Sequence, residues 1–391
     1  MDQAIFDELE QLTTAHGPAP AIDRLIAWLR ERADYTSLFY ALLLKARQEL
    51  GVSPIPTGAA KDLPESVHAP YEEAIRSAGR HVGQLCLDAG NVPQAWAYFR
   101  MLGESAPVKE ALEAYQPKQD EDIQGVIQVA YYEGVHPRRG FDLILERNGL
   151  CNAITTLSGS QGLGHAKEDR QYCIRRLIRT LYAELCERLS AEITRREGND
   201  PRESMSEVTV PKLLAGRDWL LEDEFAHIDV SHLSAVVQMS IHLDPCKELD
   251  LARELCDYGR RLPKRLTFRG EDPFDDLYVD YGVYLRILAG EQVEEGIAHF
   301  RAKANNADSD ICGTYPAQVL VNLLLRLGRT ADALAVGRQY LAAADSRHLS
   351  CPSLVELCQM AGDYKSLAQS ARDQGDTVHY LAGLLAAKQR A

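Results

Sequence analysis

The residues best suited to bind a ligand form a polar cluster in the segment YYEGVHPRRGFDLILERNGLCNAIT, residues 131–155. The candidate ligand-binding residues in it are Glu133, His136, Arg138, Arg139 and Asn152. Two adjacent guanidinium groups can grip a carboxylate or a phosphate through paired hydrogen bonds. The competing interpretation, which we favour, is a turn in which Pro137 opens a helix and the arginines face solvent or pair with neighbouring acids.

A second group of candidate ligands lies in DEFAHIDVSHLSAVVQMSIHL, residues 223–243. Imidazole and carboxylate groups are typical ligands of zinc and non-haem iron. His227 and His232 are five residues apart, however, whereas two ligands on one helix face are expected four apart. The favoured alternative is that Asp229 or Ser231 caps a helix that begins near His232.

Together the two segments predict an alternative function: a metal-dependent enzyme, or a small-ligand-binding protein, whose pocket forms where 131–155 meets 223–243. The metal-ligand set would then be His136, His227, Asp229 and His232, and the metal a divalent ion such as zinc or iron. No catalytic residue is assigned. Cys151 has no base next to it in the sequence, so nothing indicates a nucleophile.

Composition limits the classes of partner. The chain has 391 residues and a formal net charge of −14, and such an acidic surface repels phosphate backbones, so we expect no nucleic-acid partner. The most apolar run, 317–325, is too short to span a bilayer, so we expect no membrane partner. Nine cysteines without a CxxC spacing, and no secretory signal, favour the cytoplasm.

The elements that must position these residues follow a recurring pattern. An apolar helix, a glycine with a polar residue after it, and a second helix recur around Gly90, Gly290, Gly328 and Gly362. The last three glycines are separated by 38 and 34 residues, close to a repeat period of about 34. Each glycine is expected to end the first helix in a left-handed conformation, which lets the second helix fold back.

These motifs resemble those of the tetratricopeptide-repeat family. In the first copy Gly83, Gly90, Ala95 and Phe99 match the family's small, turn, small and aromatic positions. In the third copy the matching residues are Gly328 and Ala333, with Leu320 and Leu324 in the core of the first helix. Two copies depart from the pattern: one residue is inserted before Gly296, and Leu367 stands where a small residue belongs.

The resemblance implies an all-α protein in which antiparallel helix pairs stack as a right-handed α-solenoid. We divide the chain into an N-terminal helical segment, 1–50; a linker, 51–66; a helical-repeat segment, 67–120; an irregular helical middle, 121–270, with a long loop near 197–211; and C-terminal repeats, 271–391. The leading functional prediction is an interaction or scaffold protein that binds a protein or peptide in a concave groove. Self-association through the apolar end, DTVHYLAGLLAAKQRA, is a further hypothesis.

Three other segments are expected to be structural. Residues 168–196 are expected to form the longest helix, with an acidic start and a basic end that suit the helix dipole. The glycine-rich stretch 158–165 is expected to be a loop, because no strand precedes it and no lysine follows its last glycine. The acidic stretch 270–282 lacks the spacing of a calcium-binding loop and is expected to begin a helix.

Overall fold

In the computed structural model, the structure describes residues 3–55, 63–159, 164–222, 227–342, 344–373 and 375–389. Within these ranges every regular element is a helix and there is no strand, which confirms the all-helical prediction. The chain divides into two compact units, Met1–Ala153 with Gly159–Asp169 and Ile154–Ser158 with Arg170–Ala391. Each unit is described by itself.

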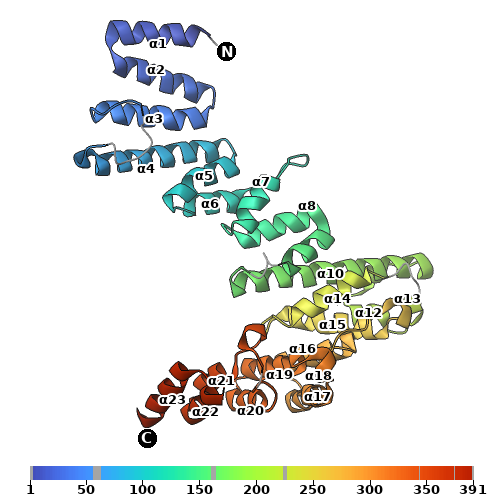
Figure 1. Cartoon of the computed structure of the whole chain (residues 1–391). Helices are drawn as coiled ribbons and strands as arrows, with labels where there is room; N and C mark the ends of the chain where they lie inside the picture. Colours follow the sequence, from blue (N-terminus) through green and yellow to red (C-terminus); the bar gives the residue numbers. More distant parts are fainter. Residues whose placement is uncertain are drawn as a thin grey trace. The chain divides into compact units, whose positions relative to one another are not determined.

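The first unit contains helices joined mostly by short turns (Figure 1). Its elements are α1 (Gln3–His16), α2 (Pro18–Glu31), α3 (Tyr35–Glu49), α4 (Glu65–Asp88), α5 (Val92–Leu102), α6 (Ala106–Ala114), α7 (Gln124–Ile127), the π-helical turn η2 (Gln128–Tyr132) and most of α8 (Pro137–Ser158). Each of α1 to α4 packs on the next helix in the chain, and α5 packs on α4, α6 and α7.

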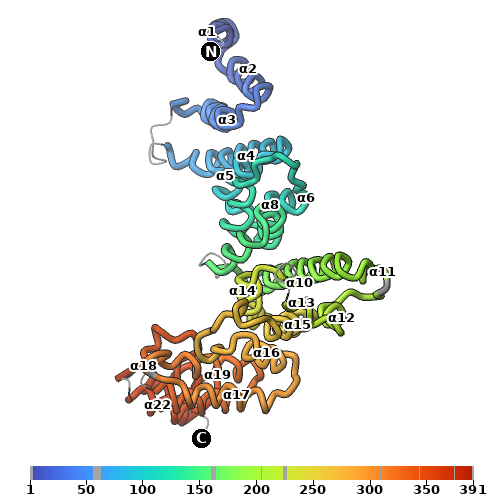
Figure 2. The backbone as a smooth tube through the Cα atoms, turned by 90° about the vertical axis from the view of Figure 1, so that its right-hand side faces the viewer, coloured from blue at the N-terminus to red at the C-terminus, as the bar shows by residue number. Residues whose placement is uncertain are grey.

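The second unit holds the remaining elements, except that the first three residues of α10 belong to the first unit. They are α10 (Lys167–Glu197), α11 (Pro201–Ser204), α12 (Val210–Leu214), α13 (Trp219–Glu222), α14 (Val230–Ser240), α15 (Lys247–Arg261), the 3-10 turn η3 (Lys264–Leu266), α16 (Leu277–Leu288), α17 (Val293–Asn306), α18 (Ser309–Cys312), α19 (Tyr315–Arg326), α20 (Thr330–Tyr340), the 3-10 turn η4 (Ser346–His348), α21 (Leu354–Ala361), α22 (Tyr364–Asp373) and α23 (Thr377–Gln389). From α14 onward, packing again joins elements that are near in sequence (Figures 1 and 2).

The four glycines of the recurring sequence pattern adopt the backbone conformation that the sequence predicts. Gly90, Gly290, Gly328 and Gly362 have φ angles of 77°, 80°, 73° and 67°. This left-handed region is open to glycine at little cost and strained for most other residues. In each copy the next helix then begins within a few residues.

Small residues bring the paired helices close together. A Cβ atom on Gly83 of α4 would lie 2.8 Å from the ring of Phe99 on α5, so only glycine fits at this crossing. Ala95 is fully buried in the same pair. In the last copy, where Leu367 replaces the small residue, the close approach comes from α23 instead: a Cβ atom on Gly383 would lie 2.8 Å from Leu367.

The long helix in the middle forms close to its predicted bounds. Residues 168–196 are expected to be helical, and α10 extends from Lys167 to Glu197. The polar stretch that follows is not a loop throughout, because it contains the short helix α11. Val210, at its end, is buried and donates its backbone N–H to the Tyr182 hydroxyl at 2.9 Å.

Other expectations for loops have mixed outcomes. The segment α8 is interrupted at Gly149, whose φ of 78° and ψ of 177° are not helical, so two helices meet there. Residues 56–62 of the expected linker and 160–163 of the glycine-rich stretch lie outside the described residues. None of the helices in the described ranges combines the length and the apolar character needed to cross a lipid bilayer.

Candidate functional site

The polar side chains of residues 131–155 make contacts within the first unit. Glu133 accepts hydrogen bonds from Trp96 Nε1 at 2.6 Å and from an Arg100 guanidinium nitrogen at 2.9 Å. These bonds tie the end of η2 to α5. His136 Nε2 lies 3.4 Å from a carboxylate oxygen of Glu113.

The two arginines of this segment are also engaged. Arg138 Nε donates to Asp169 Oδ1 at 2.6 Å, and Arg139 Nη2 donates to the carbonyl oxygen of Tyr115 at 2.7 Å. Asn152 Nδ2 bonds to a carbonyl one helical turn earlier, at 2.7 Å. These contacts match the interpretation in which the polar residues pair with their neighbours, and ligand binding by them stays a prediction.

The candidate metal ligands of the second unit have structural partners as well. His227 is buried, with Nδ1 2.5 Å from the Tyr258 hydroxyl and Nε2 3.1 Å from the carbonyl oxygen of Leu221. Both ring nitrogens therefore already hydrogen-bond, and a metal ion would have to displace one of these bonds. His232 lies in the first turn of α14, partly exposed.

Asp229, rather than Ser231, caps α14. It accepts hydrogen bonds from the backbone N–H and the hydroxyl of Ser231 at 2.8 and 2.6 Å, and the hydroxyl bond helps to lower the pKa of the carboxyl. An ionised carboxylate at a helix N-terminus is stabilised by the unpaired N–H groups there. The capping interpretation of this residue is therefore confirmed.

A metal site finds no support in the part of the chain that the structure describes. Among these residues, no group of three or more His, Cys, Asp or Glu side chains is arranged to hold a metal ion. His136 also belongs to the first unit, whereas His227, Asp229 and His232 belong to the second.

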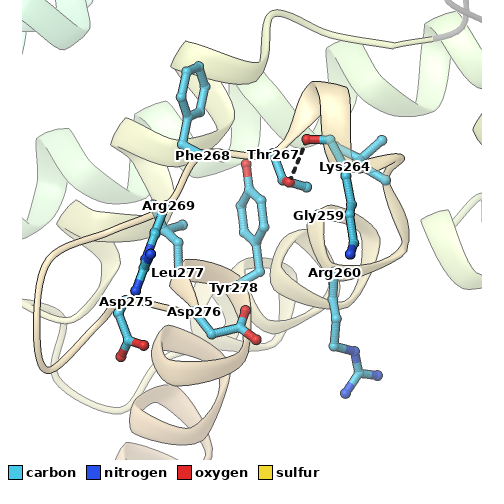
Figure 3. A pocket seen from close by; sticks show the side chains of 11 residues that line it. Gly259, Arg260, Lys264, Thr267, Phe268, Arg269, Asp275, Asp276, Leu277 and Tyr278 are labelled. Carbon is cyan, nitrogen blue, oxygen red and sulfur yellow. Dashed lines mark hydrogen bonds between the residues drawn. The ribbon is translucent and has the colours of Figure 1, made fainter.

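The second unit has a hollow that is lined by none of the site residues predicted from the sequence. It has a volume of about 550 Å³ and lies between the end of α15, the start of α16 and the connection 262–276 (Figure 3). This connection is long compared with the loops that usually join neighbouring helices, and long connections that pack against the fold are often functional. The residues that line the hollow are Gly259, Arg260, Leu262, Lys264, Thr267, Phe268, Arg269, Asp275, Asp276, Leu277 and Tyr278.

A second hollow of about 510 Å³ adjoins the first. The two share Phe268, Arg269 and Leu277 as lining residues. The second is also lined by Ser234 and Gln238 of α14, by Gly270, Glu271 and Phe274 of the connection, by Tyr281 of α16 and by Tyr315 of α19. We call the two hollows together the α15–α16 groove.

Aromatic packing holds the connection in place. Phe274 is buried and stacks on Tyr281 of α16, with ring centroids 4.1 Å apart and planes 9° from parallel. It also contacts Tyr284 and Phe300 at centroid distances of 6.1 and 5.6 Å. Such aromatic contacts stabilise a packing arrangement beyond the effect of the apolar area that they bury. They therefore hold the connection in place at Phe274.

A buried ionic cluster anchors the same connection. Asp280 of α16 is 1% exposed and accepts from His299 Nε2 at 2.7 Å, from Lys303 Nζ at 2.9 Å and from the backbone N–H of Asp276 at 2.9 Å. Lys303 also donates to Asp275, and this bond lowers the pKa of the Asp275 carboxyl. The charges of Asp275 and Asp280 are thus compensated by neighbouring side chains of α17.

The charges left in the first hollow are mainly cationic. Arg260 pairs with Asp257 at 3.3 Å, and Asp275 pairs with Lys303. Within the described residues, the side chains of Lys264 and Arg269 have no ion pair or hydrogen bond, and Asp276 is the remaining carboxylate of the lining. Two cations against one carboxylate give this part of an acidic protein a local positive balance.

One stretch of the sequence gives a signal for this site although it matches no known motif. The stretch LPKRLTFRGEDPFDD, 262–276, separates two clear helical patterns and combines cationic, aromatic and acidic residues. Its second half lacks the spacing of a calcium-binding loop. It precedes α16, which begins at Leu277, as expected for acids that lead into a helix. Comparison of the chain with protein-family models, with curated proteins and with solved structures finds no match.

Proposed function

We propose that this protein is a helical-repeat scaffold of the tetratricopeptide-like type, and that it binds an extended segment of a partner protein in the α15–α16 groove. The glycine turns and the close helix crossings support the first part, because an α-solenoid of antiparallel pairs requires tight turns and closely packed neighbouring helices. A right-handed superhelix is the arrangement that this family would imply.

The observation that carries the second part is the pairing of two adjoining hollows across one exposed aromatic residue. Phe268 is 48% exposed and lines both hollows. An extended peptide advances about 3.3 Å per residue and presents alternate side chains to opposite sides. A few consecutive residues are therefore enough to fill both hollows while their backbone passes over Phe268.

Photocrosslinking tests this proposal. With p-benzoylphenylalanine at position 268, irradiation of cells that make the protein is expected to give an adduct with one recurrent polypeptide segment. Phe6 of α1, which is 56% exposed, is the matched control position and is expected to give no such adduct. A synthetic peptide of the captured segment is expected to bind in fluorescence polarisation about tenfold more weakly to Phe268→Ala, but equally to Phe6→Ala. Equal adducts at both positions, or none at 268, would contradict the proposal.

A second candidate function is self-association through α23. The helix buries Gly383 against α22, whereas Val378, Leu381, Leu384 and Leu385 are exposed. Apolar side chains grouped on the exposed face of one helix are typical of an interaction surface. In an antiparallel pair of α23 helices centred on Ala382, Asp376 of one copy would lie beside Lys388 of the other, so the ends would be complementary in charge. We therefore propose a second copy of this chain as the occupant.

Sedimentation equilibrium tests the self-association. The wild-type chain is expected to rise with concentration from 43.5 kDa toward twice that mass. A Leu381→Glu, Leu385→Glu variant is expected to stay monomeric, because a charge buried in an apolar interface is costly. Ile311→Glu, at another exposed apolar residue, is the control and is expected to associate like the wild type. A wild-type mass that does not change with concentration would reject the second candidate.

A further inference from the structure

We infer that the first hollow of the α15–α16 groove receives an anionic side chain of the bound peptide, a carboxylate or a phosphoryl group, and that the second hollow receives an apolar side chain next to it. This inference rests on the proposed function and specifies the chemistry of the partner segment. It is carried by the charges of the first hollow, by one buried hydroxyl, and by the different lining of the second hollow.

The cationic side chains of the first hollow indicate that its ligand is negatively charged. Lys264 and Arg269 both line the first hollow, and their side chains are unpaired within the described part of the chain. The protein carries a net charge of −14, but the acids among its described residues do not neutralise these two cations. Asp275, which lines the same hollow, is paired with Lys303 instead. Lys264 and Arg269 lie on opposite sides of Tyr278 in Figure 3, so an oxyanion in this hollow would be attracted by both charges and would gain a charge-assisted hydrogen bond from the nearer one.

Tyr278 supplies an independent observation. Its side chain is 4% exposed, it lines the first hollow, and its hydroxyl is buried without a hydrogen-bond partner among the described residues. Figure 3 shows this hydroxyl ending beside Thr267 and Phe268, on the side of the connection. A buried hydroxyl without a partner is costly, and an incoming oxyanion would satisfy it as an acceptor.

The position of Tyr278 is built into the helix crossing. A Cβ atom on Gly259 of α15 would lie 2.6 Å from the ring of Tyr278, so glycine at this position lets the ring lie directly on α15. Burial also raises the pKa of the Tyr278 hydroxyl, so it keeps its proton and remains a donor at neutral pH. The fold thus holds a neutral donor in the wall of a hollow whose rim carries two cations.

The second hollow selects a different side chain. Its lining includes the rings of Phe268, Phe274, Tyr281 and Tyr315, with Ser234 and Gln238 at one side. Arg269 is shared with the first hollow, whereas Glu271 belongs to the second alone and disfavours a second anion there. An aromatic or aliphatic residue close to the acidic one is therefore the expected neighbour.

The test uses the full chain and fluorescein-labelled hexapeptide pools, acetylated and amidated at their ends, with one fixed central residue and a phenylalanine two positions after it. The fixed residue is glutamate, phosphoserine, glutamine or lysine. In fluorescence polarisation, the glutamate or the phosphoserine pool is expected to bind about tenfold more tightly than the glutamine and lysine pools. The better of the two anionic pools tells whether the natural group is a carboxylate or a phosphoryl group.

Variants connect the preference to the residues of the hollow. Lys264→Glu with Arg269→Glu is expected to abolish the preference for anionic pools, whereas Lys365→Glu with Arg372→Glu, at exposed positions of α22, has the same charge change and is expected to keep it. Tyr278→Phe is expected to weaken anionic binding about fivefold and at the same time to raise the midpoint of thermal unfolding. A purely structural role of the hydroxyl would leave the affinity unchanged.

The outcomes separate the inference from the proposed function. Equal binding of anionic and neutral pools, lost in Phe268→Ala, overturns the anionic preference but supports a peptide groove. The absence of binding by any pool also overturns the inference, while the photocrosslink at position 268 decides the proposed function separately. An anionic preference that survives Lys264→Glu with Arg269→Glu places the anion elsewhere and overturns the assignment to this hollow.

Discussion

Replacing Lys303 by methionine is expected to lower the free energy of unfolding of the second unit by about 3 kcal/mol. Asp280 is almost completely buried and relies on Lys303 and His299 for its charge compensation. Methionine keeps much of the lysine's apolar stem but removes the ammonium group. Asp280 would then keep a single side-chain partner, and Asp275 would lose the lysine that stabilises its charged form.

The effect of this substitution is expected to depend on pH. Lys303 lowers the pKa of Asp275 in the folded protein, so this contribution to stability is present above pH 3.8, the ordinary value for aspartate, and is lost as the pH falls through the lower folded pKa. Burial opposes the charge of Lys303, but hydrogen bonds to Asp275 and Asp280 outweigh it and raise its pKa. That contribution is present below pH 10.5 and is lost as the pH rises through the raised value. The wild type and Lys303→Met are thus expected to differ most between these two limits.

Urea unfolding measures the effect in the full chain. Trp219 reports on the second unit once Trp28 and Trp96, which lie in the first unit, are replaced by phenylalanine. Lys365→Met, at an exposed position of α22, is the control and is expected to change the free energy of unfolding by less than about 0.5 kcal/mol. Equal effects of the two methionine variants would show that the buried cluster does not stabilise the connection.

Features that depend on local rules could be predicted from the sequence. Gly90, Gly290, Gly328 and Gly362 take a left-handed conformation because no tertiary contact is needed to favour glycine there. The bounds of α10 follow from its long apolar periodicity and from the charges at its ends. Asp229 was a predicted helix cap because a short acidic side chain before an apolar helix reaches the first free N–H groups.

The groove could not be predicted in this way, because its lining comes from distant positions. Ser234, Phe268 and Tyr315 meet in the second hollow although they belong to α14, the connection and α19. The sequence contains only a partial signal for the buried ionic cluster. Asp280 is an acid on the apolar face of α16, and His299 and Lys303 are spaced four residues apart on α17, so both can face it. The cluster could be recognised from the sequence only if α16 were known to pack on α17, and that packing is a property of the fold.

Two glycines of the groove helices are expected to respond in opposite directions to the same substitution. Gly259→Ala is expected to destabilise the second unit by about 1–3 kcal/mol, because the added methyl group would lie 2.6 Å from the ring of Tyr278 and over-pack the crossing of α15 and α16. Gly282→Ala, in the middle of α16, is expected to stabilise it by about 0.5–1 kcal/mol. Its added methyl group would meet its nearest neighbour, Cys256, at an ordinary contact distance of 3.6 Å, and alanine loses less backbone entropy in a helix.

The pair of glycine variants also tests how the groove is built, since only one of them displaces a lining residue. Gly259→Ala has to push Tyr278 off α15 and is therefore expected to weaken binding of the photocrosslinked peptide, whereas Gly282→Ala is expected to leave it unchanged. Urea unfolding monitored at Trp219 and fluorescence polarisation with that peptide measure the two effects. If both glycines were tolerated equally, neither close packing of Tyr278 on α15 nor its place in the wall of the hollow would be supported. Opposite signs in stability, together with a loss of affinity in Gly259→Ala alone, would connect the helix crossing directly to the binding surface.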